Sequence, residues 1–401
     1  MRASKCIGAG WLAWVAVLGL ASEAGAAQKR EGDSGREATL PKLPVTHSRF
    51  YDLYSRLDQD TLREAVARLT SVAKDYQRRT ASFRHESMPR LPVYLFDSYE
   101  DYLAAGGPEK SCGLYKGTSV LGYFPKGHPD TLWPTLQHEC WHQYVSRAVG
   151  GDWPAWLEEG LAEYYGVAIW TGDDLITGIV PPDYLERVQA DIKERKLLLL
   201  TRLLNMDMDT WIANMSEVQY DQAWSLVHFL AHAESDKYRK GLVELIKEAA
   251  KSQPGMESFR RVFGAKYFEA QREYERWWMA LTPEATRERT TRATVSTLTS
   301  FLARAHLKGM KFKDAEAFFA AAKDGSVLAA AQAKAALWLP KSLLERQLER
   351  AEKLQAWSLA TAGKHPELRL RQDGAALVGR FELSPTKGIE VKVVSIKEKE
   401  R

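Results

Sequence analysis

The segment TLQHECWHQYV, residues 135–145, limits what this chain can fold into more than any other feature. On an α-helix each residue turns by about 100°, so His138 and His142 face the same way, one turn apart. Two imidazoles in this arrangement can share one tetrahedral metal ion. Glu139 lies beside them rather than in line, which suits a base acting on a metal-bound water. The alternative is a helix with two hydrogen-bonded core histidines.

We expect this helix to begin near Asp130 and Thr131 and to end at Gly150-Gly151. Cys140 lies about 200° around the helix axis from both histidines. It is therefore excluded as a ligand of the same ion.

A second helix is predicted in DWPAWLEEGLAEYYG, residues 152–166, beginning near Pro154. Glu159 and Glu163 are spaced i, i+4 and share a face. Glu159 can complete a His-His-Glu site, and Glu163 can accept the outer N–H of a ligand histidine. Glu158 points about 100° away and is the alternative ligand. A solvated acidic face is disfavoured because the helix is too apolar.

The succession HECWH, WLEEGLAEY and YDQAWSLVHFL resembles the gluzincin zinc metallopeptidases, and most closely the exported bacterial peptidase MA-like proteins. The resemblance covers residues 46–285. It implies an α+β, thermolysin-like domain with a small N-terminal sheet and a helical C-terminal lobe. It also implies one Zn²⁺ per chain bound by His138, His142 and Glu159, with Glu139 as catalytic base.

Tyr220 matches the position of the family's oxyanion-stabilising tyrosine or histidine, and a phenol is a suitable donor for that purpose. The β-rich segment before the zinc helix resembles the strand that pairs with substrate in gluzincins. We therefore expect Val120, Leu121, Gly122 and Tyr123 to form a substrate rim, unless the strand is central and already paired on both sides.

An extended peptide or protein is the expected substrate. The family's Gly-x-Met-Glu-Asn segment, which binds a substrate amino terminus, is not found before the zinc helix. Endopeptidase action is therefore favoured over exopeptidase action. Two alternatives stay open: a catalytically retired zinc-bearing binding or scaffold protein, and a hydrolase of cell-wall peptides.

The resemblance and the composition together give a domain plan. We expect a signal peptide at 1–26, a flexible leader at 27–45, the metallopeptidase domain at 46–290, a helical appendage at 291–365 and a β-hairpin tail at 366–401. The helical appendage should turn near a glycine at 309, and an Asp-Gly pair at 373–374 marks the hairpin turn.

A short basic region, an apolar run and a small-residue cleavage site predict export to the periplasm or beyond the cell. No stable membrane insertion is expected after cleavage, because the apolar run is short. The net charge of +4, from 56 basic and 52 acidic residues, is too balanced to indicate a nucleic-acid partner. The sequence leaves open the oligomeric state and whether Cys112 and Cys140 pair.

Overall fold

The structure is a computed structural model, and it describes residues 40–82, 88–125, 132–233, 236–251, 256–264, 267–372, 374–384 and 388–397. The predicted signal peptide and most of the predicted leader lie outside the described residues. The part of the leader that is described belongs to the fold, because Leu40 and Leu43 pack against a buried cluster that contains Phe96 and Tyr102. The first strand then begins at Val45, within the predicted leader.

The chain divides into two compact units. The first contains the described residues up to Leu62 together with Val72–Ala168 and Val180–Pro283. The second contains Arg63–Ser71, Ile169–Ile179 and Glu284 onwards. The unit boundary at Pro283 lies near the predicted boundary at residue 290. The second unit also takes in two segments from the N-terminal half of the chain.

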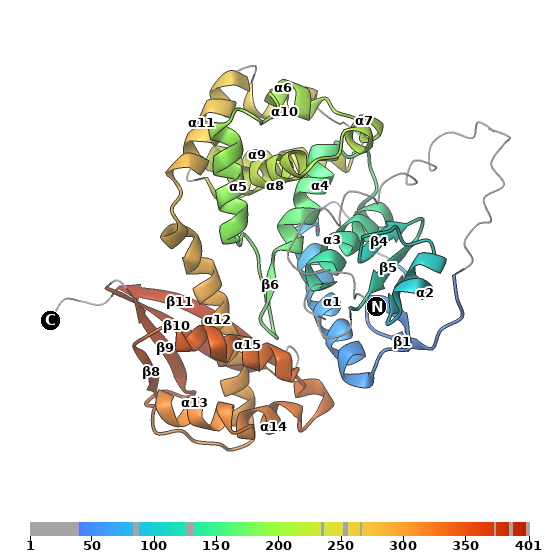
Figure 1. The fold of residues 1–401 in the computed structure, drawn as a ribbon. Helices are drawn as coiled ribbons and strands as arrows, with labels where there is room; N and C mark the ends of the chain where they lie inside the picture. Colours follow the sequence, from blue (N-terminus) through green and yellow to red (C-terminus); the bar gives the residue numbers. More distant parts are fainter. Residues whose placement is uncertain are drawn as a thin grey trace, which may run out of the picture. The chain divides into compact units, whose positions relative to one another are not determined.

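The first unit has a five-stranded sheet with the strand order β1-β2-β3-β5-β4. Three of its strands, β1, β4 and β5, are labelled in Figure 1. Its strands are β1 (Val45–His47), β2 (Tyr51–Ser55), β3 (Leu91–Phe96), β4 (Gly113–Lys116) and β5 (Ser119–Tyr123). β2, β3 and β5 are parallel, whereas β1 and β4 pair antiparallel with β2 and β5. The molecule is thus mixed α+β, as predicted, with a small N-terminal sheet.

β5 is an interior strand of this sheet. It pairs in parallel with β3 and antiparallel with β4, so both sides of its backbone are used. Its two faces are also covered: Leu121 packs in the cluster with Tyr102 of α2, and Gly122 lies against Leu136 of α3. The prediction that residues 120–123 form a substrate rim is therefore wrong, and the outer strand at this side of the described sheet is β4.

The rest of the first unit is helical, although Arg63–Ser71 in the middle of its first helix belongs to the second unit. Its helices are α1 (Gln59–Arg79), α2 (Tyr99–Ala104), α3 (Leu132–Tyr144), α4 (Ala155–Gly166), α5 (Pro182–Lys193), α6 (Leu200–Leu204), α7 (Met208–Ala213), α8 (Glu217–His232), α9 (Asp236–Ala249), α10 (Met256–Phe263) and α11 (Tyr267–Ala280). Asp58, Ser98 and Ser216 cap α1, α2 and α8 through side-chain oxygens that accept backbone N–H groups.

α3 continues into a π-helical turn, η2 (Val145–Val149), before the chain reverses. Gly150 and Gly151 both have positive φ, of 69° and 93°, a region open to glycine. The predicted end of this helix is therefore confirmed. Its predicted start at Asp130 and Thr131 lies outside the described residues.

The second unit combines a two-stranded hairpin, helices and a four-stranded sheet of order β11-β10-β9-β8. Its elements are β6 (Ile169–Trp170), β7 (Leu175–Ile176), α12 (Pro283–Leu307), α13 (Ala315–Lys323), α14 (Ser326–Gln332), η3 (Ala335–Leu337), α15 (Lys341–Glu352), β8 (Trp357–Ala360), β9 (Glu367–Gln372), β10 (Ala375–Ser384) and β11 (Gly388–Lys397). The predicted turn near Gly309 separates α12 from α13. The predicted hairpin joins β9 to β10, inside a larger sheet.

One face of the C-terminal sheet packs on α12. Leu370 of β9 and Leu377 of β10 form a buried cluster with Val295 of that helix. Gly379 is required for the close approach, because a Cβ there would lie 2.0 Å from Oγ1 of Thr299.

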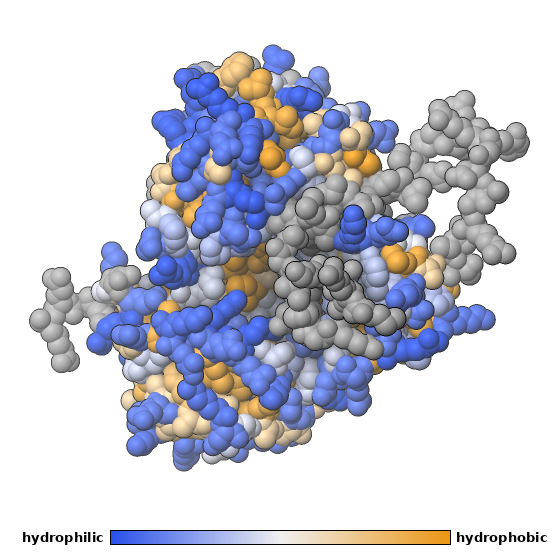
Figure 2. Space-filling model, in the orientation of Figure 1, coloured by the Kyte–Doolittle hydropathy of each residue, from blue (hydrophilic) through white to orange (hydrophobic). Residues whose placement is uncertain are grey.

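On the face shown in Figure 2, hydrophilic residues predominate and hydrophobic ones form scattered patches. Single large apolar side chains are exposed, such as Phe268 at 67% and Leu199 at 53%. Scattered exposure of this kind is ordinary for a folded chain. Within the described residues, none of the helices combines the length and apolar character needed to cross a bilayer.

Candidate metal centre

α3 and α4 form an antiparallel pair that is held together by hydrogen bonds from one side chain to the backbone (Figure 1). The amide nitrogen of Gln137 donates to the carbonyls of Tyr165, Gly166 and Ala168, at 2.8, 3.0 and 3.1 Å. These carbonyls are at the C-terminal end of α4, where helix carbonyls have no intrahelical partners. These hydrogen bonds join the residue before His138 to the end of the helix that carries Glu159, and so they set the spacing of the two helices.

Gly160 brings α4 close to α8. A Cβ at this position would lie 2.5 Å from the carbonyl oxygen of Ala223 and 2.8 Å from Cγ2 of Val227, both on α8. Real Cβ atoms do not make such contacts with backbone, so only glycine permits this helix spacing. Because Gly160 follows Glu159 directly, the same contact between α4 and α8 fixes the position of the Glu159 carboxylate.

The predicted ligands His138, His142 and Glu159 converge in the interior. The Nε2 atoms of the two histidines are 3.0 Å apart, and Oε2 of Glu159 is 3.5 Å from each of them. All three side chains are at most 5% exposed. Their ligating atoms lie within 4.8 Å of one another, so the group can hold a metal ion. Among the described residues, it is the one set of three or more such side chains with this spacing.

The outer nitrogen of each histidine faces a carboxylate. Nδ1 of His138 is 3.0 Å from Oε1 of Glu163, as predicted for Glu163. Nδ1 of His142 is 3.0 Å from Oε1 of Glu158. Outer partners of this kind fix the tautomer and direct Nε2 inward. Glu158 was predicted only as an alternative ligand, and its position at the outer nitrogen was not foreseen.

The charges of the site favour a cation. Among the described residues, neither carboxylate oxygen of Glu159 has a hydrogen-bond partner, although the side chain is fully buried. A buried carboxylate without donors is costly unless a positive charge is close. Burial alone would raise the pKa of Glu159, but the positive charge of His142 and the close approach of both imidazoles, at 3.5 Å, outweigh it and lower the pKa to about 2. The donor set and this unsatisfied carboxylate fit a divalent ion.

The neighbouring carboxylates raise the pKa values of both imidazoles. Burial lowers the pKa of His138, but the contacts with Glu159 and Glu163 outweigh it and raise the pKa to about 9. For His142, burial is likewise outweighed, here by Glu159 and Glu158, and the pKa lies well above its ordinary value. The carboxylates thus attract positive charge to this position, whether it is a proton on a histidine or a metal ion.

Glu139 is held by the backbone of the neighbouring strand. Its Oε2 accepts the N–H of Tyr115, on β4, at 2.7 Å. Burial raises the pKa of Glu139, while the charges of His138 and His142 and this hydrogen bond act in the opposite direction. A buried carboxylate with a raised pKa, next to the ligands, has the character of a general base.

Gly113 allows β4 to lie close to α3. A Cβ at Gly113 would be 2.3 Å from Cγ2 of Thr135 and 3.4 Å from Cγ of Glu139. The carbonyl of Cys112 accepts the N–H of Tyr123 on β5, so along the strand Cys112 and Leu114 face β5. Gly113 and Tyr115 then direct their N–H and C=O groups away from β5, towards the metal centre.

Tyr220 lies near the beginning of α8 and is 4% exposed. Its hydroxyl donates to the sulfur of Met215 at 3.5 Å, and sulfur is a weak acceptor. Burial and the charge of Glu159 raise the pKa of Tyr220 well above its ordinary value, so the phenol stays protonated. The structure therefore places a protonated donor within the electrostatic reach of Glu159.

Within the described residues, Cys112 and Cys140 form no disulfide bond. Cys140 is fully buried and contacts Tyr51, on the side of α3 away from the ligands, which agrees with its exclusion as a ligand. Burial raises the pKa of the Cys140 thiol above its ordinary value.

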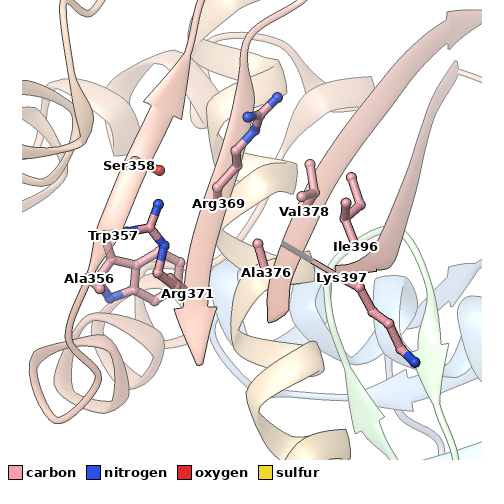
Figure 3. Close-up of a pocket in the computed structure, with 9 residues that line it drawn as sticks. All are labelled: Ala356, Trp357, Ser358, Arg369, Arg371, Ala376, Val378, Ile396 and Lys397. Atoms are coloured by element: carbon pink, nitrogen blue, oxygen red, sulfur yellow. The ribbon is translucent and has the colours of Figure 1, made fainter. Parts of the chain in front are cut away.

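A cavity of about 350 Å³ lies elsewhere, on the C-terminal sheet of the second unit (Figure 3). Its lining is Ala356, Trp357, Ser358, Arg369, Arg371, Ala376, Val378, Ile396 and Lys397. Among these described lining residues there is no histidine, cysteine or carboxylate, so the cavity offers no ligand set for a metal ion.

Comparisons with known proteins give one match. The profile of a family described as a protein of unknown function, DUF1570, matches residues 133–255. This range includes the ligands on α3 and α4 as well as Tyr220. No curated protein and no solved structure matches the chain.

Proposed function

We propose that this protein is an exported zinc-dependent peptidase of the gluzincin type, and that it cleaves within extended polypeptide chains. The observation that carries the proposal is the buried convergence of His138, His142 and Glu159, with Glu139 next to the two histidines. Two imidazoles and one carboxylate are the ligands of several catalytic zinc sites, which keep a fourth position for water or substrate.

When bound, zinc would supply a Lewis acid that polarises a carbonyl and lowers the pKa of a water molecule. His138, His142 and Glu159 would hold it. Glu158 and Glu163 would hold the two imidazoles with Nε2 directed inward.

Glu139 is proposed to accept the proton of the attacking water and to return it to the leaving amine. Its raised pKa suits both steps, and the N–H of Tyr115 keeps one carboxylate oxygen fixed. Tyr220 is proposed to donate to the oxygen that becomes negative during the attack. Its burial and its weak sulfur acceptor support this role, because little is lost when the hydroxyl turns to another acceptor.

β4 replaces β5 as the proposed substrate rim. Gly113 and the carbonyl of Tyr115 face away from β5, and an extended peptide could add beside them as a further strand. The strand lies directly over Glu139, so a peptide paired with it would pass the metal centre.

The decisive experiment is a comparison of the wild-type protein with Glu139→Gln. The variant should keep one zinc per chain and lose cleavage of a proteome-derived peptide library. Cleavage within the peptides would support endopeptidase action, and removal of single terminal residues would contradict it. Cross-linked cell-wall peptides should be assayed in parallel. If the zinc-loaded wild type cleaves neither set, the proposal fails and a binding or scaffold role takes its place.

A further inference from the structure

Two histidines of the second unit face each other through ring nitrogens. Nδ1 of His365 is 3.3 Å from Nε2 of His306. His306 lies in the last turn of α12, and His365 lies in the loop between β8 and β9. They are 59 residues apart in the chain, so tertiary structure brings them together.

This separation matches that of two ligands on one metal ion. Zinc–nitrogen bonds of about 2.0–2.1 Å at a tetrahedral angle place two ligand nitrogens about 3.3 Å apart. The value is slightly longer than the usual range of about 2.7–3.2 Å for hydrogen bonds. At the buried centre the corresponding distance between His138 and His142 is 3.0 Å.

The rings are held in place by an aromatic side chain. The ring of Phe381, on β10, lies 4.9 Å from that of His365 and 5.6 Å from that of His306. Phe381 is 3% exposed, whereas both histidines are partly exposed. Phe381 therefore fixes one side of the histidine pair. The other side is accessible to solvent, so a metal ion can enter.

Two features of the surroundings favour a cation. The C-terminal end of a helix carries partial negative charge, and His306 is in the last turn of the 25-residue α12. Glu382 is an acidic electrostatic neighbour of His365, and in the sheet it stands opposite Glu390. Burial, the neighbouring His306 and Lys364 act in the opposite direction and outweigh Glu382, so the pKa of His365 is lowered. The imidazole is then neutral, which is the form that binds a metal ion.

We propose that His306 and His365 form a second metal site, which binds a borderline divalent ion such as Zn²⁺, Cu²⁺ or Ni²⁺. Imidazole is a suitable ligand for all three ions. The site supplies two nitrogens, and water can complete the coordination. It binds more weakly than the buried centre because it has fewer protein ligands and is partly exposed. It does not depend on peptidase activity.

The test separates the two sites. In the His142→Ala variant, which removes a ligand of the buried centre, zinc is titrated by equilibrium dialysis and by calorimetry. We expect about one remaining equivalent of zinc per chain. Adding His306→Ala or His365→Ala should weaken this binding at least about tenfold, and Glu382→Gln should weaken it by a smaller factor. His47→Ala, at an exposed histidine of the first unit, is the matched control and should change nothing.

Copper gives an independent readout in the His142→Ala background. There the electron paramagnetic resonance of bound Cu²⁺ should show two coordinated nitrogens, and either histidine variant should lose this two-nitrogen pattern. Thermal unfolding checks that each variant is folded. The proposal is overturned if the His142→Ala variant binds no zinc, or if binding survives the removal of both His306 and His365. In that case the two rings only share a hydrogen bond.

Discussion

Oε1 of Glu158 lies 3.0 Å from Nδ1 of His142, while Oε1 of Glu163 lies 3.0 Å from Nδ1 of His138. Neighbouring turns of α4 thus supply a carboxylate to each histidine of α3, on either side of Glu159. The two glutamates differ in exposure, since the Glu158 side chain is 20% exposed and that of Glu163 is 4% exposed.

This difference gives the first prediction. Glu163→Gln and Glu158→Gln both keep an oxygen that can accept the imidazole N–H, but both remove the negative charge. Loss of such an outer partner typically costs about 10- to 100-fold in metal affinity. We expect the larger loss for Glu163→Gln, because the charge of Glu158 is partly screened by solvent.

Chelator competition measures the zinc affinity of both variants. Glu194→Gln is the control, because Glu194 is exposed and pairs with Lys196. Equal and unchanged affinities for Glu158→Gln and Glu163→Gln would show that the outer carboxylates do not hold the ligands.

The second prediction concerns Tyr220→Phe. Removal of the hydroxyl loses a weak contact with the sulfur of Met215 and a contact with the side chain of Trp211, so stability should fall by no more than about 1 kcal/mol. If the hydroxyl stabilises the developing oxyanion, kcat should fall by about 10²–10³ with little change in KM. Steady-state kinetics on a cleaved peptide measures this.

Tyr274→Phe is the matched control for Tyr220→Phe. The Tyr274 hydroxyl is buried and bonds to Oγ of Ser225 at 2.6 Å, so its loss should lower stability by about 1 kcal/mol without a selective effect on kcat. A normal kcat in a folded Tyr220→Phe protein would remove Tyr220 from the mechanism.

The third prediction concerns Gly160→Ala. In an exposed helix this change would stabilise by about 1 kcal/mol. Here the new Cβ would meet the carbonyl of Ala223, and such overpacking costs about 1–3 kcal/mol. We expect a lower melting temperature together with weaker zinc binding, because α4 and Glu159 must move away from α8.

Gly363→Ala is the control for Gly160→Ala, because the nearest atom to its new Cβ is 3.5 Å away, an ordinary contact distance. A Gly160→Ala variant with wild-type stability and wild-type zinc affinity would mean that α4 can shift freely without disturbing the ligands.

The ligands could be predicted from the sequence because helical periodicity fixes which side chains share a face. His138, His142, Glu159 and Glu163 follow from that rule and from the glycine turn between two helices. The position of Glu158 did not follow. Spacing places it about 100° from Glu159, but only the crossing of α3 and α4 decides that this direction leads to the outer nitrogen of His142.

The N-terminal sheet shows a second limit of prediction from the sequence. The β-rich segment with residues 120–123 was recognisable as a strand, and it lies in β5. Strand order, however, depends on pairing between distant segments. The short β4, with two glycines nearby and a weak pattern, folds back on β5 and occupies the edge. Likewise the hairpin at residues 373–374 was predicted, but β8 and its place beside β9 were not.

The last prediction follows from the contact between β4 and α3. In Tyr115→Pro the backbone N–H that Glu139 accepts is removed. This N–H points away from β5, so the sheet loses no hydrogen bond with that strand, and proline is tolerated at such edge positions. A hydrogen bond to a charged group is worth about 1.5–3 kcal/mol, or about 10- to 100-fold in rate.

We expect kcat of Tyr115→Pro to fall within that range, while zinc stays bound at the buried centre. Tyr115→Ala keeps the N–H and should retain far more activity, which separates the backbone donor from the aromatic ring. In a Glu139→Gln background the proline should cause little further loss, because both changes act on the same carboxylate. If Tyr115→Pro and Tyr115→Ala have the same kcat, the N–H does not hold the base in place, and β4 contributes only its edge to the site.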